Sequence, residues 1–186
     1  MRCLVVLCCV AATALGAQQP TPPVPESTRA ESARAESVRM PPPPPSLDQK
    51  RFQDGWRTAG RGIAQLNYGL ARVARAQANN DTEDQHTAGR LLAGWCGSAR
   101  AFMRRGRPRM NPTVYADSAR LSARRLVTQL DSLIAYAPTC EDSAAARPGP
   151  VAAGLGKRMK AYDTAARDFK VAIGQRVDSA KGSRKP

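Results

Sequence analysis

The sequence predicts an all-α protein, in which an antiparallel four-helix bundle follows a signal peptide and a disordered proline-rich arm. Three observations lead to this prediction. Residues 1–17 have the charge and hydropathy order of a secretory signal, and nine of the 15 prolines fall before residue 46. From residue 46 onward, apolar residues recur at spacings of three and four, which is typical of helices that bury one face.

The first 17 residues are predicted to direct export. Arg2 supplies a short positive region, the stretch from Cys3 to Leu15 is almost wholly apolar, and the small residue Ala17 precedes polar sequence. A bilayer-spanning helix needs about 20 apolar residues, so the run is better suited to a cleavable signal than to an anchor. We expect cleavage after Ala17, with an uncleaved membrane anchor as the alternative.

Export fixes the expected location. The mature chain would be periplasmic or extracellular, and its abundance of Ala, Arg, Gly and Pro, whose codons are GC-rich, indicates a bacterial source. Removal of residues 1–17 deletes a single charged residue, Arg2, so the formal net charge falls from +14 to +13. No transmembrane helix is expected after cleavage.

Residues 18–45 are expected to form a disordered linker. The five-residue repeats 26–30, 31–35 and 36–40 each begin with Glu-Ser, and five consecutive prolines follow at residues 41–45. The segment has few large apolar residues and cannot bury a core. Its proline run predicts a stiff polyproline spacer, at about 3.1 Å per residue.

The helical domain is expected to span residues 46–181, with a basic tail at residues 182–186. Capping-box spacings at Ser46 and Thr82 predict two helix starts, and Asn111 before Pro112 predicts a third. Pro138 is expected to end the third helix. Short loops between neighbouring helices favour an antiparallel arrangement. The predicted helices span residues 47–78, 83–105, 112–137 and 150–181.

Three glycines recur every seven residues beside the apolar seam of the first predicted helix. They are Gly55, Gly62 and Gly69, and each is unfavourable by about 1 kcal/mol relative to alanine in a helix interior. Small residues on one stripe allow another helix to come close. We expect this stripe to pack against the alanine-rich third or fourth helix, with a ligand groove as the alternative.

Cys96 and Cys140 are the cysteines that remain in the expected mature chain. In an oxidising compartment, two cysteines in one chain predict an intramolecular disulfide. A tight hinge at residues 106–111 opposes this pairing, because it would set Cys96 opposite Leu121. Cys140 would then lie about 28 Å away at 1.5 Å per residue, whereas bridged Cα atoms lie within about 7 Å.

Two glycines flank Cys96 and offer a way out of this conflict. If Gly94 and Gly97 broke the second helix, the distance to Cys140 would shorten. An intramolecular disulfide and free or intermolecular thiols therefore both remain open.

The densest group of charges is a cluster of arginines near the end of the second predicted helix. It is the candidate anion-binding site, and it consists of Arg100, Arg104, Arg105, Arg107 and Arg109. The segment from Arg105 to Pro108 resembles the core of the AT-hook, an element that binds the DNA minor groove. It also has the features of a helix terminus, where arginine is favoured and Gly and Pro end the helix.

No catalytic, metal or cofactor motif is recognisable. His86 is the only histidine in the sequence, so neither a zinc site nor a c-type haem attachment motif can be assembled. Haem ligation by His86 with Met103 or Met159 is conceivable, but methionine is usually core filler. We therefore expect no cofactor and no enzymatic activity.

These observations predict an exported, non-enzymatic helical protein of the cell envelope or periplasm. Its expected partners are a protein, an anionic envelope polymer or a lipid surface, since a net charge of this size attracts anionic surfaces. Two alternatives remain. One is a small-ligand-binding or enzymatic bundle with a site between helices, and the other is a nucleic-acid-binding protein that uses residues 100–109.

Overall fold

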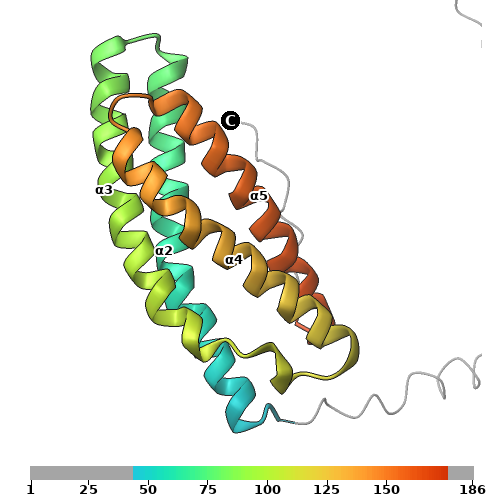
Figure 1. The fold of residues 1–186 in the computed structure, drawn as a ribbon. Coiled ribbons are helices and arrows are strands. Elements are labelled where there is room, and N and C mark those ends of the chain that lie inside the picture. Colours follow the sequence, from blue (N-terminus) through green and yellow to red (C-terminus); the bar gives the residue numbers. More distant parts are fainter. Residues whose placement is uncertain (1–43, 176–186) are drawn as a thin grey trace, which may run out of the picture. The chain divides into compact units, whose positions relative to one another are not determined.

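The computed structural model describes residues 44–175. Within this range the chain contains helices and connecting segments but no strand, which confirms the predicted all-α class. The expected signal peptide at 1–17, the arm up to residue 43 and the basic tail at 182–186 lie outside the described residues. The helices are α2 (Leu47–Ala78), α3 (Thr82–Gly106), α4 (Asp117–Ser143) and α5 (Pro148–Ala172), with short 3-10 helices η1 (Arg107–Arg109) and η2 (Pro112–Val114) between α3 and α4 (Figure 1).

Helices α2 and α3 form an antiparallel pair with a close backbone approach. The start of α2 is set by Ser46 and Gln49, which form the predicted capping box. Helix α3 is capped by Asp81, and not by Thr82 as the sequence suggested. The carboxylate of Asp81 accepts hydrogen bonds from the backbone amides of Glu83 and Asp84. The three-residue connection between Ala78 and Thr82 then turns the chain back on itself.

The glycine stripe of α2 faces α3, which corrects the expectation that it packs against the third or fourth helix. A Cβ added at Gly62 would lie 2.5 Å from the carbonyl oxygen of Ala99. Gly55 meets the backbone of Gly106 in the same way, and Gly69 leaves room for the ring of Trp95. The glycines therefore allow the two backbones to approach more closely than any side chain would permit.

Helices α4 and α5 form a second antiparallel pair, and α5 also contacts α2. The hydroxyl of Tyr136 in α4 donates to the carbonyl oxygen of Val151 at 3.2 Å, close to the α4–α5 connection. At the other end of α5, Phe169 packs against Phe52 and Trp56 of α2, with ring centroids 5.3 Å apart in both pairs. Large apolar side chains from all four long helices are fully buried in one core, among them Phe52, Leu92, Leu126, Leu130 and Phe169.

The third predicted helix has different bounds from those expected. Asn111 and Pro112 begin the 3-10 helix η2, while α4 begins at Asp117. Helix α4 then continues through Pro138 to Ser143, because proline removes a single backbone donor and the buried residues Cys140 and Ala144 hold the last turns in the core. The segment before α4 also supplies core residues that the sequence did not reveal, namely Met110 and Tyr115.

The fourth predicted helix, expected over residues 150–181, spans Pro148–Ala172. Its last residue is Ala172, and Gly174, two positions further on, has a φ of +72°. The amides of Gly174 and Gln175 donate to carbonyl oxygens of the last turn, those of Val171 and Lys170. A left-handed glycine with this bonding is a common helix terminator, and it explains why α5 ends before it. The predicted helical residues 176–181 lie outside the described residues.

Cys96 and Cys140 form a disulfide between α3 and α4, with their Cα atoms 6.0 Å apart. The predicted conflict with geometry is resolved by the segment 107–116 and not by a break at Gly94 or Gly97, since α3 is continuous through both. This segment carries the chain away from the end of α3, so α4 starts at a distance from α3. Helix α4 then approaches α3 as it runs toward its own C-terminal end (Figure 1). The tight hinge assumed from the sequence was therefore wrong.

We expect Gly62→Ala to lower the free energy of unfolding by about 1 to 3 kcal/mol, because its methyl group would overlap the backbone of Ala99. Gly60→Ala is the matched control, since nothing lies within 4 Å of a Cβ at that position of the same helix. The control should raise stability by up to about 1 kcal/mol through helix propensity. Urea unfolding measures both, and equal effects would contradict the close approach of α2 and α3.

Replacement of both cysteines, Cys96→Ala with Cys140→Ala, should lower the free energy of unfolding by about 2 to 4 kcal/mol, since the bridge closes a loop with a sequence separation of 44 residues. The measurement is urea unfolding of the oxidised protein, with thiol titration of the unfolded wild type as its control. Two free thiols and an unchanged midpoint would refute the bridge.

Candidate anion-binding surface

The predicted arginine cluster is divided by the fold. Arg100 lies 3.2 Å from a carboxylate oxygen of Glu141 in α4. Arg107 makes a bidentate pair with Asp131 of α4, through Nε at 2.6 Å and Nη2 at 3.0 Å. These two arginines therefore hold α3 and η1 against α4 and are occupied within the protein.

The segment that resembles an AT-hook does not have the extended form that such an element needs. Gly106 is buried at the end of α3 against the backbone of α2, and the following residues, Arg107–Arg109, form the 3-10 helix η1. With Arg107 bound to Asp131, this segment is a helix terminus packed on the core. Its geometry does not suit insertion into a minor groove.

The other three arginines of the cluster lie on the surface. Arg104, Arg105 and Arg109 are exposed, and none of them has a carboxylate within 4.0 Å among the described residues. The guanidinium of Arg105 lies 6.0 Å from the ring centroid of Phe102. The structure thus leaves three of the five predicted residues accessible to an anion.

A second group of cations, on α5, was not singled out from the sequence. Within residues 44–175 the ion pairs all take their arginine from α2, α3 or η1, and none takes its cation from α5. The α5 residues concerned are Lys157, Lys160, Arg167 and Lys170. Their separations of three, seven and three residues repeat along one side of a helix, and this spacing was the signal available in the sequence.

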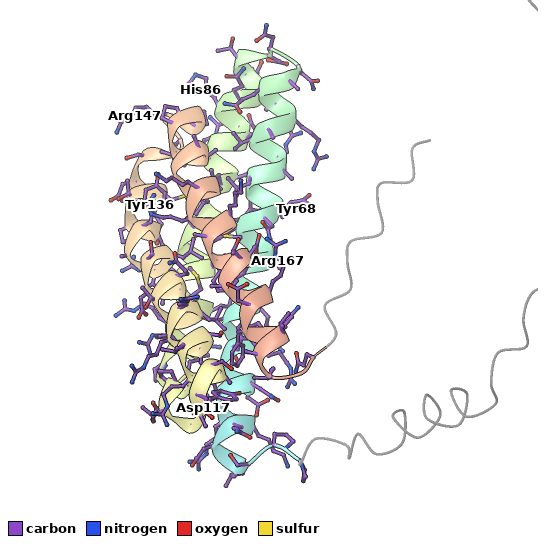
Figure 2. The ribbon with its side chains drawn as sticks, turned by 90° about the vertical axis from the view of Figure 1, so that its right-hand side faces the viewer. Tyr68, His86, Asp117, Tyr136, Arg147 and Arg167 are labelled. Carbon is purple, nitrogen blue, oxygen red and sulfur yellow. A yellow bond between two sulfur atoms is a disulfide. The ribbon has the colours of Figure 1, made fainter. Side chains whose placement is uncertain are left out.

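Two hollows flank α5 and bring these cations together. One lies between α2 and α5, has a volume of about 600 Å³ and includes Lys160, Arg167 and Lys170 in its lining. The other lies between α4 and α5, has a volume of about 400 Å³ and includes Arg125, Lys157 and Lys160. Figure 2 shows Arg167 on the part of α5 that is next to α2. Lys160 lines both hollows, so the two form a nearly continuous basic surface around α5.

An aromatic pair joins α2 to α5 beside this hollow. The indole nitrogen of Trp56 donates to the hydroxyl of Tyr162 at 2.9 Å, and Lys170 lies 5.9 Å from the ring centroid of Trp56. Burial raises the pKa of Tyr162 to about 12, which the hydrogen bond from Trp56 partly offsets. Tyr162 is therefore neutral at physiological pH, and its hydrogen bond with Trp56 links α5 to α2.

His86 and Met103, one of the two pairs considered for haem, lie far apart. His86 is exposed at the end of α3 near the α2–α3 connection (Figure 2), whereas Met103 is fully buried 17 residues further along the same helix. At 1.5 Å per residue this separation is about 25 Å. Among residues 44–175 no group of three or more His, Cys, Asp or Glu side chains is placed to hold a metal ion.

None of the helices within residues 44–175 combines the length and the hydropathy needed to cross a membrane.

The ion pairs predict different losses of stability when Arg107 and Arg105 are replaced. We expect Arg107→Ala to lower the free energy of unfolding by about 1 kcal/mol, because it removes the bidentate pair with Asp131. Arg105→Ala, the matched control two residues earlier, should change the free energy of unfolding by less than about 0.5 kcal/mol. Thermal and urea unfolding of the two variants test this, and an equal loss in both would speak against the observed pairing.

Comparison of the chain with protein family models, with curated protein sequences and with solved structures found no match. We therefore infer function from the charges and hollows of the described residues.

Proposed function

We propose that this chain is an exported, non-enzymatic protein of the cell envelope or periplasm, and that it acts by binding an anionic polymer through the basic surface around α5. In this proposal a cleaved signal peptide and a proline-rich spacer precede an antiparallel four-helix bundle. The contacts between α2 and α3 run in opposite residue order, and Figure 1 shows α4 and α5 side by side and joined by a short turn, which supports the bundle.

The observation that carries the proposal is the surplus of uncompensated cations on α5. The helix has five Lys or Arg residues and two carboxylates, Asp163 and Asp168. Arg158 is stacked over the ring of Tyr136 at 4.1 Å, and the other four cations line the two hollows. Like charges so close together repel one another, and an anionic partner relieves that repulsion.

The disulfide supports export. Cys96 and Cys140 are fully buried and bridged in the core, and disulfides of this structural kind persist mainly in oxidising compartments. A polymer of the envelope would meet the protein there, whereas nucleic acid is largely confined to the cytoplasm.

The nucleic-acid alternative has less support than the polymer. Its motif required Arg105, Gly106 and Arg107 as an extended strand, but Gly106 is packed against α2 and Arg107 is paired with Asp131. The small-ligand alternative is favoured by one specific observation, the hollow between α2 and α5.

The test compares two variants with the same net charge. In the first, Lys157, Lys160, Arg167 and Lys170 are replaced by alanine, which removes the surface around α5. In the control, four exposed arginines of α2 and α3 are replaced, namely Arg57, Arg61, Arg75 and Arg90. Binding to heparin and to vesicles containing phosphatidylglycerol is measured over a series of salt concentrations.

We expect the first variant to lose at least about tenfold in heparin affinity at about 0.1 M salt, with a shallower salt dependence. The control should lose much less, because its arginines lie outside the two hollows. Equal losses in both variants would show that net charge alone attracts the polymer. Binding to vesicles but not to heparin would replace the polymer by a lipid surface.

A further inference from the structure

The hollow between α2 and α5 is an open groove, lined by Asn67 and Leu70 of α2 and by α5 residues from Gly156 to Lys170. The hydrogen bond from Trp56 to Tyr162 joins the two helices within this span. The groove has a volume of about 600 Å³. Ligand sites in proteins commonly have volumes of about 300 to 1,000 Å³.

The floor of the groove is apolar and its rim is charged. Leu70 of α2 and Met159 of α5 lie in it, and Met159 is almost fully buried. Lys160, Arg167 and Lys170 add positive charge along about 15 Å of α5, taking 1.5 Å per residue. An occupant therefore has negative charge at intervals and a surface that tolerates apolar contact.

Asp163 narrows the chemistry further. It lies in the same lining, one turn from Lys160 and one turn from Arg167, and it makes no ion pair within 4.0 Å among the described residues. An ionised carboxylate can only accept hydrogen bonds. Beside a bound anion it is repulsive unless the same ligand also presents donors. A linear polyphosphate offers no hydroxyl for it, whereas an acidic sugar presents several hydroxyls beside its carboxylate.

We propose that this groove binds a short stretch of an acidic polysaccharide, with sugar carboxylates at Lys160, Arg167 and Lys170 and a sugar hydroxyl donating to Asp163. The proposal rests on the proposed function and names its polymer class and its site. The amide of Asn67, in the opposite wall, offers both a donor and an acceptor to the remaining hydroxyls. The apolar floor at Leu70 and Met159 suits the C–H faces of sugar rings.

Gly156 provides a way to fill the groove without removing any charge. It lines the groove on α5, and nothing lies within 4 Å of a Cβ added there. Gly156→Leu therefore places a side chain in the open space that a sugar would occupy. Gly94→Leu is the matched control, because Gly94 is also helical with an open Cβ position, on α3 and outside the groove. Both changes replace glycine by a better helix former, so neither should weaken the fold.

The first experiment is calorimetric titration of the mature, oxidised protein with tetragalacturonic acid and with neutral cellotetraose. We expect the wild type and Gly94→Leu to bind the acid alike. Gly156→Leu should bind it at least about tenfold more weakly, because the ligand and the new side chain compete for one space. Unchanged affinity in Gly156→Leu, or cellotetraose bound as tightly as the acid, would overturn the proposal.

The second experiment separates recognition of a sugar hydroxyl from simple charge attraction, because the two predict opposite changes in affinity when Asp163 is replaced. Asp163→Ala makes the protein more positive, so a binding site that senses charge alone would bind every polyanion more tightly. We expect about tenfold weaker binding of tetragalacturonic acid, because the hydroxyl loses its acceptor, together with tighter binding of a linear polyphosphate.

Asp168→Ala is the control for this change, since Asp168 lines the hollow between α4 and α5. It should strengthen the binding of both probes slightly. Tighter binding of tetragalacturonic acid by Asp163→Ala would refute the role of Asp163 and leave a charge-only surface. If the cations of α5 are needed for heparin binding but Gly156→Leu binds tetragalacturonic acid as tightly as the wild type, the groove is not the binding site and the proposed function stands. If the wild-type protein binds none of these anionic polymers, both the proposed function and the proposed site are refuted.

Discussion

The position of α4 relative to α3 depends on residues 107–116 and is fixed by the disulfide. Met110 and Tyr115 are buried in the core, so this connecting segment is anchored along its length. As a result, α4 begins at a distance from the end of α3. Cys140 consequently reaches Cys96, and the two Cα atoms come within 6.0 Å. A shorter connection would place residues near Leu121 beside Cys96, and every side-chain contact between the two helices would change.

The same register determines where the charges of the protein are compensated. It brings Asp131 to Arg107 and Glu141 to Arg100, so two carboxylates of α4 are taken up by arginines outside α5. Helix α5 packs against α4 and α2 and finds no ion-pair partner among the described residues. Two carboxylates of α4 are thus paired with arginines of α3 and η1, while the cations of α5 have no ion-pair partner among the described residues. The sequence-derived cluster at residues 100–109 serves partly to hold α3 and α4 together.

Local sequence signals predicted much of this fold. The capping box at Ser46 and the spacing of apolar residues predict the bounds of α2, because these depend on residues a few positions apart. Long-range features were not predictable in this way. Asn111 and Pro112 were read correctly as a cap, but of a 3-10 helix, since the choice between that and a longer helix depends on the burial of Tyr115. The glycine stripe was recognised, but its partner could not be known from spacing alone.

The candidate site was harder to predict than the helices. Adjacent arginines stand out in a sequence, yet Arg100 and Arg107 are occupied by carboxylates that lie 41 and 24 residues away. The cations of α5 are spread over 14 positions and are interrupted by apolar residues, so they gather only when the helix forms.

The most direct test of the α3–α4 register is peptide mapping of the protein recovered from its native compartment, digested without reduction and after alkylation of free thiols. The account predicts that the mature monomer contains one cross-linked peptide pair joining Cys96 to Cys140. Alkylated cysteines at both positions, or a bridge between two copies of the chain, would contradict it.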